Sequence, residues 1–127
     1  MPFQISKESD LLHITLSGSI STADLQAALR ELEVTESRQT RIPDRLIDLS
    51  AVTQSLIRGD DVYFTATRRR EGKYPNPFRS AIVAVQPIQI GFARMFQSYN
   101  VHPDITIQVF PDGASALAWL GLPPTAV

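Results

Sequence analysis

The sequence predicts an α/β fold with the element order β-β-α-β-α-β-α-β-α and a mainly parallel sheet that has one antiparallel edge strand. Two observations predict this fold. Short segments with the two-residue alternation of strands recur between segments with the spacing of amphipathic helices, which favours parallel strands joined by right-handed crossovers. The first two strand segments are joined by only a few residues, which favours a hairpin. The 127 residues have room for one core, so we expect a single domain over residues 1–127.

The predicted hairpin contains the strands Phe3–Ile5 and Leu11–Ser17, with a polar turn over Lys7–Asp10 between them. One face of the second strand is apolar at every second residue: Leu12, Ile14 and Leu16. This alternation indicates a strand with one buried face. Gly18 is expected to end the strand, and the first strand is the predicted antiparallel edge of the sheet.

The first helix is predicted over Thr22–Glu33. Ser21 and Asp24 have the spacing of a capping box, in which each side chain accepts a hydrogen bond from the other residue's backbone N–H. Apolar residues then follow at helical spacing: Leu25, Ala28, Leu29 and Leu32. The segment Val34–Pro43 has no periodicity, and we expect an exposed loop there.

The third strand is predicted over Arg45–Leu49, in the interior of the sheet because it has few polar positions. The segment Ser50–Gly59 is expected to connect it to a helix over Asp60–Glu71. Acidic residues begin that helix and three consecutive arginines end it, and both choices complement the helix dipole. Gly72 is the expected residue just beyond the helix.

The last third of the chain predicts a strand within Phe78–Val85, a helix over Ile88–Tyr99, a strand over Ile105–Val109 and a final helix capped by Asp112. The strand Ile105–Val109 alternates apolar and polar residues, whereas the final helix has apolar residues at helical spacing. These elements complete the alternation of helices and strands.

The composition excludes several classes of function. The net charge of −1 argues against a nucleic-acid partner, because phosphate binding needs a basic balance. The absence of cysteine excludes disulfides and thiol chemistry. The two histidines, His13 and His102, have no partner at metal-ligand spacing, so we expect neither a metal site nor a cofactor. No apolar run reaches the ~20 residues of a membrane span, and the N-terminus lacks signal-peptide features, so a cytoplasmic location is expected.

The carboxyl end of the third strand is the first candidate site. In open α/β sheets ligands tend to meet the ends of parallel strands, which places Asp48 and Ser50 at a binding edge. An equally weighted interpretation is that Asp48 only fixes the following loop through backbone hydrogen bonds. The sequence has no nucleophile elbow, phosphate-binding loop or dinucleotide motif, so an enzyme centred on Asp48 is the least favoured hypothesis.

The second candidate site lies between the two helices that follow the third and fourth strands. The cluster Arg68–Arg70 with Lys73 indicates a solvated helix end or, alternatively, a site for an anionic group. Several large apolar residues on these helices either complete the core or line a cleft: Tyr63, Phe64, Phe92, Met95, Phe96 and Tyr99.

Two segments carry a resemblance to a known family: LIDLSAVTQ, which is Leu46–Gln54, and ARMFQ…ITIQVFPDGASALAWL, which ends at Leu120. With the hairpin, they resemble the SpoIIAA-like proteins of the STAS fold. These are relatives of bacterial anti-sigma-factor antagonists, and their fold is also compared with that of CRAL-TRIO lipid carriers. The resemblance covers about Phe3–Gly121, and its most specific parts are Ala93–Met95 and Ala116–Leu120.

The sequence departs from the signalling members of this family at one motif. Those members carry D-S-S-G about six residues after D-L-S-x-V, and a partner kinase phosphorylates the second serine. Here the matching segment is Leu56–Gly59, of which only Gly59 agrees with the motif. Arg58 occupies the phosphoserine position and places a fixed positive charge where the switch installs negative charge. We therefore expect no phosphorylation switch there.

The resemblance implies a non-catalytic binding or regulatory module. Its expected partner is an amphiphilic or anionic small molecule, or a membrane surface, held between the helices Asp60–Glu71 and Ile88–Tyr99. Arg58, Arg68 or Arg94 is expected to meet the charged end, with Tyr63, Phe64 and Met95 on the apolar part. The alternative is a protein-interaction module that uses residues 50–59. The resemblance leaves open a homodimer.

Overall fold

The computed structural model describes residues 2–8 and 10–124. It contains one five-stranded sheet in the order β1-β2-β3-β4-β5. Its strands are β1 (Phe3–Glu8), β2 (Leu11–Ile20), β3 (Asp44–Ser55), β4 (Phe78–Val83) and β5 (Ile105–Phe110). β1 pairs antiparallel with β2, and the other neighbouring pairs are parallel. The predicted fold class, the antiparallel edge strand and the interior third strand are confirmed.

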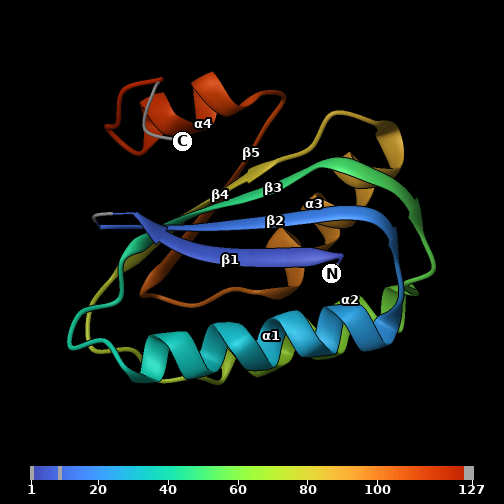
Figure 1. Cartoon of the computed structure of the whole chain (residues 1–127). Coiled ribbons are helices and arrows are strands. Elements are labelled where there is room, and N and C mark those ends of the chain that lie inside the picture. The colour runs from blue at the N-terminus through green and yellow to red at the C-terminus, as the bar shows by residue number, and fades with distance from the viewer. Residues whose placement is uncertain (1, 9, 125–127) are drawn as a thin grey trace.

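The helices lie unequally on the two faces of the sheet (Figure 1). α1 (Thr22–Ser37), α2 (Gly59–Arg70) and α3 (Pro87–Tyr99) cover one face, whereas α4 (Gly113–Trp119) covers part of the other. The alternation of β2 divides its side chains between two cores. Leu12, Ile14 and Leu16 join the core beneath the three helices, and Leu11 packs with Leu117 of α4. The predicted apolar face of β2 is therefore confirmed.

β2 and β3 are longer than predicted, because each supplies the backbone partners of the other. Gly18 does not end β2, and the segment Ser50–Ser55 is strand rather than a connection. The parallel pairing runs on through irregular register as far as Ile20 opposite Ser55. Gly18 adopts φ +72°, a left-handed conformation that costs L-residues energy, within this irregular stretch. The true connection to α2 is only the segment 56–58.

Other boundaries also moved outward from the prediction. β1 continues to Glu8, where a polar turn was expected, because its backbone pairs with that of β2. α1 continues to Ser37, so the expected loop over Val34–Pro43 begins later. That segment is not uniformly exposed either, since Glu36 and Ile42 are buried. By contrast, β4 (Phe78–Val83) lies within the predicted segment Phe78–Val85.

The predicted helix caps are confirmed. Ser21 and Asp24 form the capping box at the start of α1, with hydrogen bonds of 3.2 and 2.9 Å. Asp112 Oδ1 accepts a hydrogen bond of 2.7 Å from the Ser115 N–H at the start of α4. Gly72 follows the C-cap of α2, and a Cβ there would lie 2.6 Å from the Tyr74 hydroxyl. A larger residue at this position would therefore displace the Tyr74 hydroxyl.

Candidate functional site

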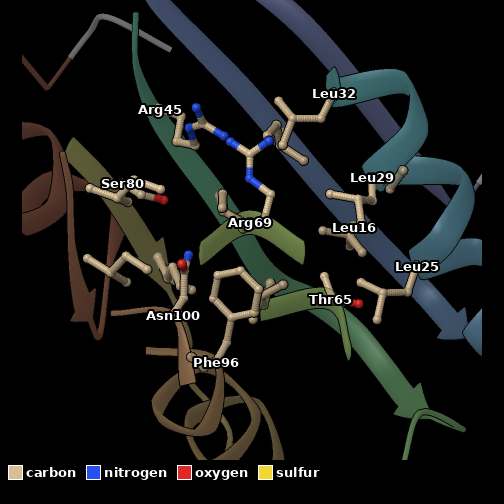
Figure 2. A pocket seen from close by; sticks show the side chains of 18 of the residues that line it. Leu16, Leu25, Leu29, Leu32, Arg45, Thr65, Arg69, Ser80, Phe96 and Asn100 are labelled. Carbon is tan, nitrogen blue, oxygen red and sulfur yellow. The ribbon is translucent and has the colours of Figure 1, made fainter. Parts of the chain in front are cut away.

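An apolar cavity of about 110 Å³ lies between the sheet and the helices α1, α2 and α3. Figure 2 shows leucines of α1 and β2 on one side of it and Arg45, Ser80 and Asn100 on the other. The apolar lining residues come from the sheet, α1 and α3: Ile14, Leu16, Leu25, Ala28, Leu29, Leu32, Ile47, Leu49, Phe78, Ile82, Phe92, Ala93, Phe96, Ile105 and Ile107. The polar ones are Arg45, Thr65, Arg69, Ser80 and Asn100. The site is therefore an apolar chamber with a polar patch.

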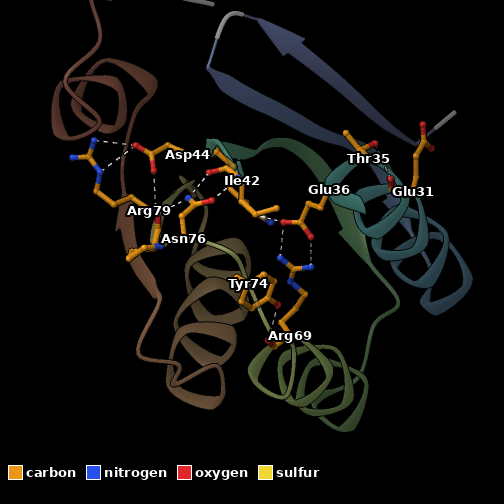
Figure 3. Close-up of polar contacts among 11 residues, drawn as sticks. Glu31, Thr35, Glu36, Ile42, Asp44, Arg69, Tyr74, Asn76 and Arg79 are labelled. Carbon is orange, nitrogen blue, oxygen red and sulfur yellow. Dashed lines mark hydrogen bonds and ion pairs between the residues drawn. The ribbon is translucent and has the colours of Figure 1, made fainter. Parts of the chain in front are cut away.

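The polar patch is built on a buried carboxylate that contacts two arginines. Arg69 of α2 donates two hydrogen bonds to Glu36 of α1, of 2.6 and 2.9 Å, as Figure 3 shows. Arg45 of β3 also donates to Glu36. The exposed fractions of the three side chains are 7% for Glu36, 3% for Arg45 and 6% for Arg69. This cluster joins the sheet to two helices in a place that water hardly reaches.

The surroundings of the cluster favour the charged form of the Glu36 carboxylate but disfavour the charged form of Arg45. Burial pushes the pKa of Glu36 upward, but the hydrogen bonds and charges of Arg69 and Arg45 outweigh it and lower that pKa from 4.5. Burial lowers the pKa of Arg45 to about 10, against the attraction of Glu36 and with the repulsion of Arg69. Both arginines stay charged at neutral pH, so the cluster carries one uncompensated positive charge.

Aromatic rings stabilise the two guanidinium groups. The guanidinium carbon of Arg45 lies 4.3 Å from the ring centroid of Phe78, and that of Arg69 lies 5.1 Å from the centroid of Tyr74. Such contacts contribute about 0.5–2 kcal/mol each, more when water is excluded. The Tyr74 hydroxyl also donates a hydrogen bond of 2.7 Å to the backbone carbonyl of Arg69, and this bond holds the ring against α2.

Two buried polar atoms in the cavity wall have no hydrogen-bond partner among the described residues. They are Nε of Arg45 and Oδ1 of Asn100, whose residues are 3% and 5% exposed. Buried polar groups are nearly always paired, and an unpaired one costs roughly 1–3 kcal/mol. An occupant of the cavity that bonds to these atoms would recover this cost.

A smaller cavity of about 30 Å³ lies beside the first, between the ends of β2 and β3 and the start of α3. The two cavities share the lining residues Leu16, Leu49 and Phe92. The smaller one is also lined by Ile88, whose side chain is 58% exposed. The first turn of α3 thus lines the smaller cavity and also reaches solvent.

The structure places the predicted residues Asp48 and Ser50 away from this cavity. Asp48 pairs with Thr15 and Val83 in the sheet, and Val83 packs beneath α4 on the opposite face. Asp48 Oδ1 accepts hydrogen bonds from the Ser50 backbone N–H, at 2.9 Å, and from the Ser50 hydroxyl, at 2.6 Å. These bonds agree with the interpretation that Asp48 stabilises the local backbone.

The predicted residues on the helices divide between the cavity and the surface. Phe92 and Phe96 line the main cavity, whereas the others do not: Arg58, Tyr63, Phe64, Arg68, Arg94, Met95 and Tyr99. Tyr63 and Phe64 are 44% and 69% exposed. Phe64 lines a polar surface groove between α1 and α2 together with Arg68, which makes two hydrogen bonds of 2.8 Å to Glu33. Three others lie at the surface around α2 and α3: Arg58, Arg94 and Met95.

Neither a metal centre nor a membrane span is found within residues 2–8 and 10–124. No group of three histidine or acidic side chains in these ranges could hold a metal ion. His13 lies 3.5 Å from the Thr15 hydroxyl, and His102 contacts the Gly72 carbonyl at 2.9 Å. None of the helices in these ranges has the length and apolar character to cross a bilayer.

No protein-family model matches the chain, and no curated protein matches it significantly. A solved structure from Shewanella loihica PV-4 aligns with 93% of this chain and 91% of its own, at a TM-score of 0.60 and 20% sequence identity. It is an uncharacterized protein from the DUF3478 family with a SpoIIAA-like fold. This chain has a SpoIIAA-like fold. A second structure, of Mglu, aligns with 83% of this chain and 19% of its own at 16% identity, but its TM-score of 0.31 is too low to indicate a shared fold.

The resemblance seen in the sequence thus predicted the SpoIIAA-like fold correctly, but it did not point to the cavity. Arg45 and Asn100 were not predicted as site residues, and Arg69 was predicted only as part of the cluster Arg68–Arg70, not as a buried residue. A signal for Arg69 was present, because Val62, Thr65, Ala66 and Arg69 are the buried residues of α2 and follow one another at helical spacing. Arg45 and Asn100 occupy a strand start and a helix end, where nothing in the sequence marks them as buried.

Proposed function

We propose that this SpoIIAA-like protein is a non-catalytic binding module whose ligand is a small amphiphilic molecule held in the cavity beneath α1, α2 and α3. The observation that carries the proposal is the apolar cavity of about 110 Å³ with a charged patch in its wall. A well-packed core has few voids larger than a water molecule, so space of this size is unusual. Pockets that are mostly apolar with a few convergent polar groups are typical of ligand sites.

The size of the cavity limits the ligand. An apolar cavity of roughly 150 Å³ binds benzene, whereas sites for drug-sized ligands measure about 300–1,000 Å³. A volume of about 110 Å³ therefore suits a body of a few carbon atoms. A long-chain fatty acid or a phospholipid would enter only if the helices moved apart, so the amphiphile is expected to be short.

The proposal is tested with benzene as an apolar probe in a ¹⁵N–¹H NMR titration. Ala93 lines the cavity and is 1% exposed, so Ala93→Leu extends into the empty space. We expect benzene to perturb residues that line the cavity in the wild type, and the Ala93→Leu variant to lose this response.

Two control variants sharpen this test. Phe64→Ala removes an outward-facing ring and should leave benzene binding unchanged. Ala116→Leu places the same added bulk in the tight core beneath α4, where overpacking costs about 1–3 kcal/mol, so it should destabilise the protein more than Ala93→Leu does. Absence of a benzene response in the wild type, or an equal response in Ala93→Leu, would contradict the proposal.

A second candidate function is a protein-interaction module at the carboxyl edge of the sheet. Exposed apolar side chains gather where β3 leads into α2 and α3 begins: Leu56 is 57% exposed and Ile88 is 58% exposed. Arg58 caps α2 at this edge with 81% of its side chain exposed and a fixed charge at the position of the family's phosphoserine. We infer that this position has no phosphorylation switch. Co-purification of a stable partner that Arg58→Glu abolishes would support this function, and an association unchanged by Arg58→Glu would exclude Arg58 from it.

A further inference from the structure

The cavity has a surplus of one positive charge at its polar end. Arg45 and Arg69 each contribute a positive charge, and Glu36 contributes the negative charge between them. The nearby Tyr74 is neutral at pH 7, as a phenol ordinarily is, and burial raises the pKa of its hydroxyl further. Glu33, the next acidic residue on this face of α1, makes its ion pair with the exposed Arg68. The buried cluster thus lacks one negative charge.

Arg45 is the arginine with unused hydrogen-bonding capacity. Arg69 directs two donors at Glu36, whereas the hydrogen bond of Arg45 to Glu36 uses its Nη2 and leaves its buried Nε without a partner within residues 2–8 and 10–124. Asn100 at the end of α3 is the second underused group, since its Oδ1 also has no partner in these ranges. Figure 2 shows both side chains in the cavity wall opposite the leucines of α1.

We propose, building on the proposed function, that the polar end of the cavity binds the carboxylate of a small monocarboxylic acid. One carboxylate oxygen accepts a hydrogen bond from Nε of Arg45, and the single negative charge balances the surplus positive charge of the cluster. Asn100 donates to the second oxygen after its amide rotates. Glu36 is a positioning residue, because it holds Arg45 and Arg69 without touching the ligand.

The rest of the cavity selects the body of the acid. The opposite wall consists of leucine side chains from α1 and β2, which favour a branched aliphatic or a small aromatic group. A phosphate monoester fits less well, because its charge of about −1.5 to −2 exceeds the surplus of one and would leave part of the charge buried without compensation.

The test compares two probes of matched shape, 3-methylbutanoate and 3-methylbutanamide, by isothermal titration calorimetry at pH 7. We expect the wild type to bind the carboxylate at least about tenfold more tightly than the amide, as befits one charge-assisted hydrogen bond in a buried site. In Arg45→Met, which removes the charged guanidinium but keeps an unbranched side chain, this preference should disappear while the amide still binds.

A second variant protects the test against misfolding of Arg45→Met. Asn100→Asp keeps the side-chain shape but adds a negative charge in the cavity wall, so it should abolish carboxylate binding and spare amide binding. Circular dichroism and thermal unfolding check that both variants are folded.

The outcomes separate the two proposals. If the wild type binds the amide as tightly as the carboxylate, or if both variants keep the preference, the carboxylate inference is wrong and the cavity proposal stands. If neither probe binds and benzene does not bind either, the cavity proposal itself is wrong.

Discussion

Replacing Glu36 with Gln should destabilise the protein strongly, because it removes the carboxylate that two buried arginines share. Arg45 and Arg69 have exposed fractions of 3% and 6%, and both direct hydrogen bonds at Glu36. Breaking a buried ion pair by neutralising one partner typically costs about 3–5 kcal/mol, since the remaining charge is left buried without compensation. Here two like charges remain. Small domains are stable by about 5–15 kcal/mol, so the loss is a large part of the total.

The assay is urea unfolding followed by circular dichroism, with thermal unfolding as a second measurement. A loss of about 3 kcal/mol corresponds to a melting temperature roughly 10 °C lower for a domain of this size. The matched control is Glu33→Gln, because Glu33 lies on the same helix and pairs with the next arginine of α2 along the chain, Arg68, at the surface. Exposed pairs contribute little, so this variant should unfold nearly as the wild type does.

If Glu36→Gln and Glu33→Gln change the stability by similar amounts, the buried cluster does not contribute as argued. A small effect of Glu36→Gln would mean that water or a neighbouring group compensates the two arginines.

Two further predictions concern pH and glycine. The pKa of Glu36 is lowered from 4.5 in the folded protein, so between this lowered pKa and pH 4.5 the unfolded chain binds more protons than the folded protein does. The stability that Glu36 contributes is therefore complete above about pH 4.5 and is lost as the pH falls through the pKa of the folded protein. Urea titrations across this window should show the gap between wild type and Glu36→Gln narrowing as pH falls, and a constant gap would refute the assignment. Gly18→Ala should lower the free energy of unfolding by about 1–2 kcal/mol because φ is +72°, whereas Gly91→Ala within α3 should raise it by about 0.5–1 kcal/mol. Neither added Cβ meets an atom within 4 Å, so equal effects of the two substitutions in chemical unfolding would contradict the backbone argument.

The positions of the secondary-structure elements could be predicted from local patterns in the sequence. The alternation over Ile105–Val109 predicted β5, and the spacing of Ser21 and Asp24 predicted the start of α1. Both signals are local: an alternating strand must bury one face, and a capping box satisfies N–H groups that every helix start leaves free. These patterns do not depend on what the element packs against.

The ends of several elements could not be predicted in this way. β3 was expected to stop at Leu49, where its apolar run ends, yet it continues through polar residues to Ser55 because the backbone of β2 pairs with it. α1 was expected to stop at Glu33, yet it reaches Ser37 because Glu36 packs against Arg45 and Arg69. In both cases a partner distant in the sequence stabilises residues whose own propensity is weak.

The candidate site shows even more clearly that local patterns do not determine which side chains are buried. Three consecutive arginines at the end of α2 have the same local character, and of these Arg68 was expected, as an alternative to Arg58 or Arg94, to meet the charged end of the ligand. In the structure Arg68 pairs with Glu33 at the surface, whereas Arg69 points inward and contacts Glu36. Of the residues that the sequence singled out, Phe92 and Phe96 line the cavity, and Asp48 and Ser50 lie on β3. The others lie at the outer surfaces of α2 and α3, and the roles of all of them stay predictions.

The sequence by itself determined the α/β class, the order of the elements, the antiparallel edge and the resemblance to SpoIIAA-like proteins, because these depend on periodicity, caps and short motifs. Only the tertiary structure decided that a cavity exists and that Arg45, Arg69 and Glu36 meet in its wall. The physical reason is that the volume of a cavity is the difference between the volume enclosed by the packed elements and the volume of the side chains that fill it. That difference depends on the spacing and rotation of helices against the sheet, which no segment of the chain specifies alone.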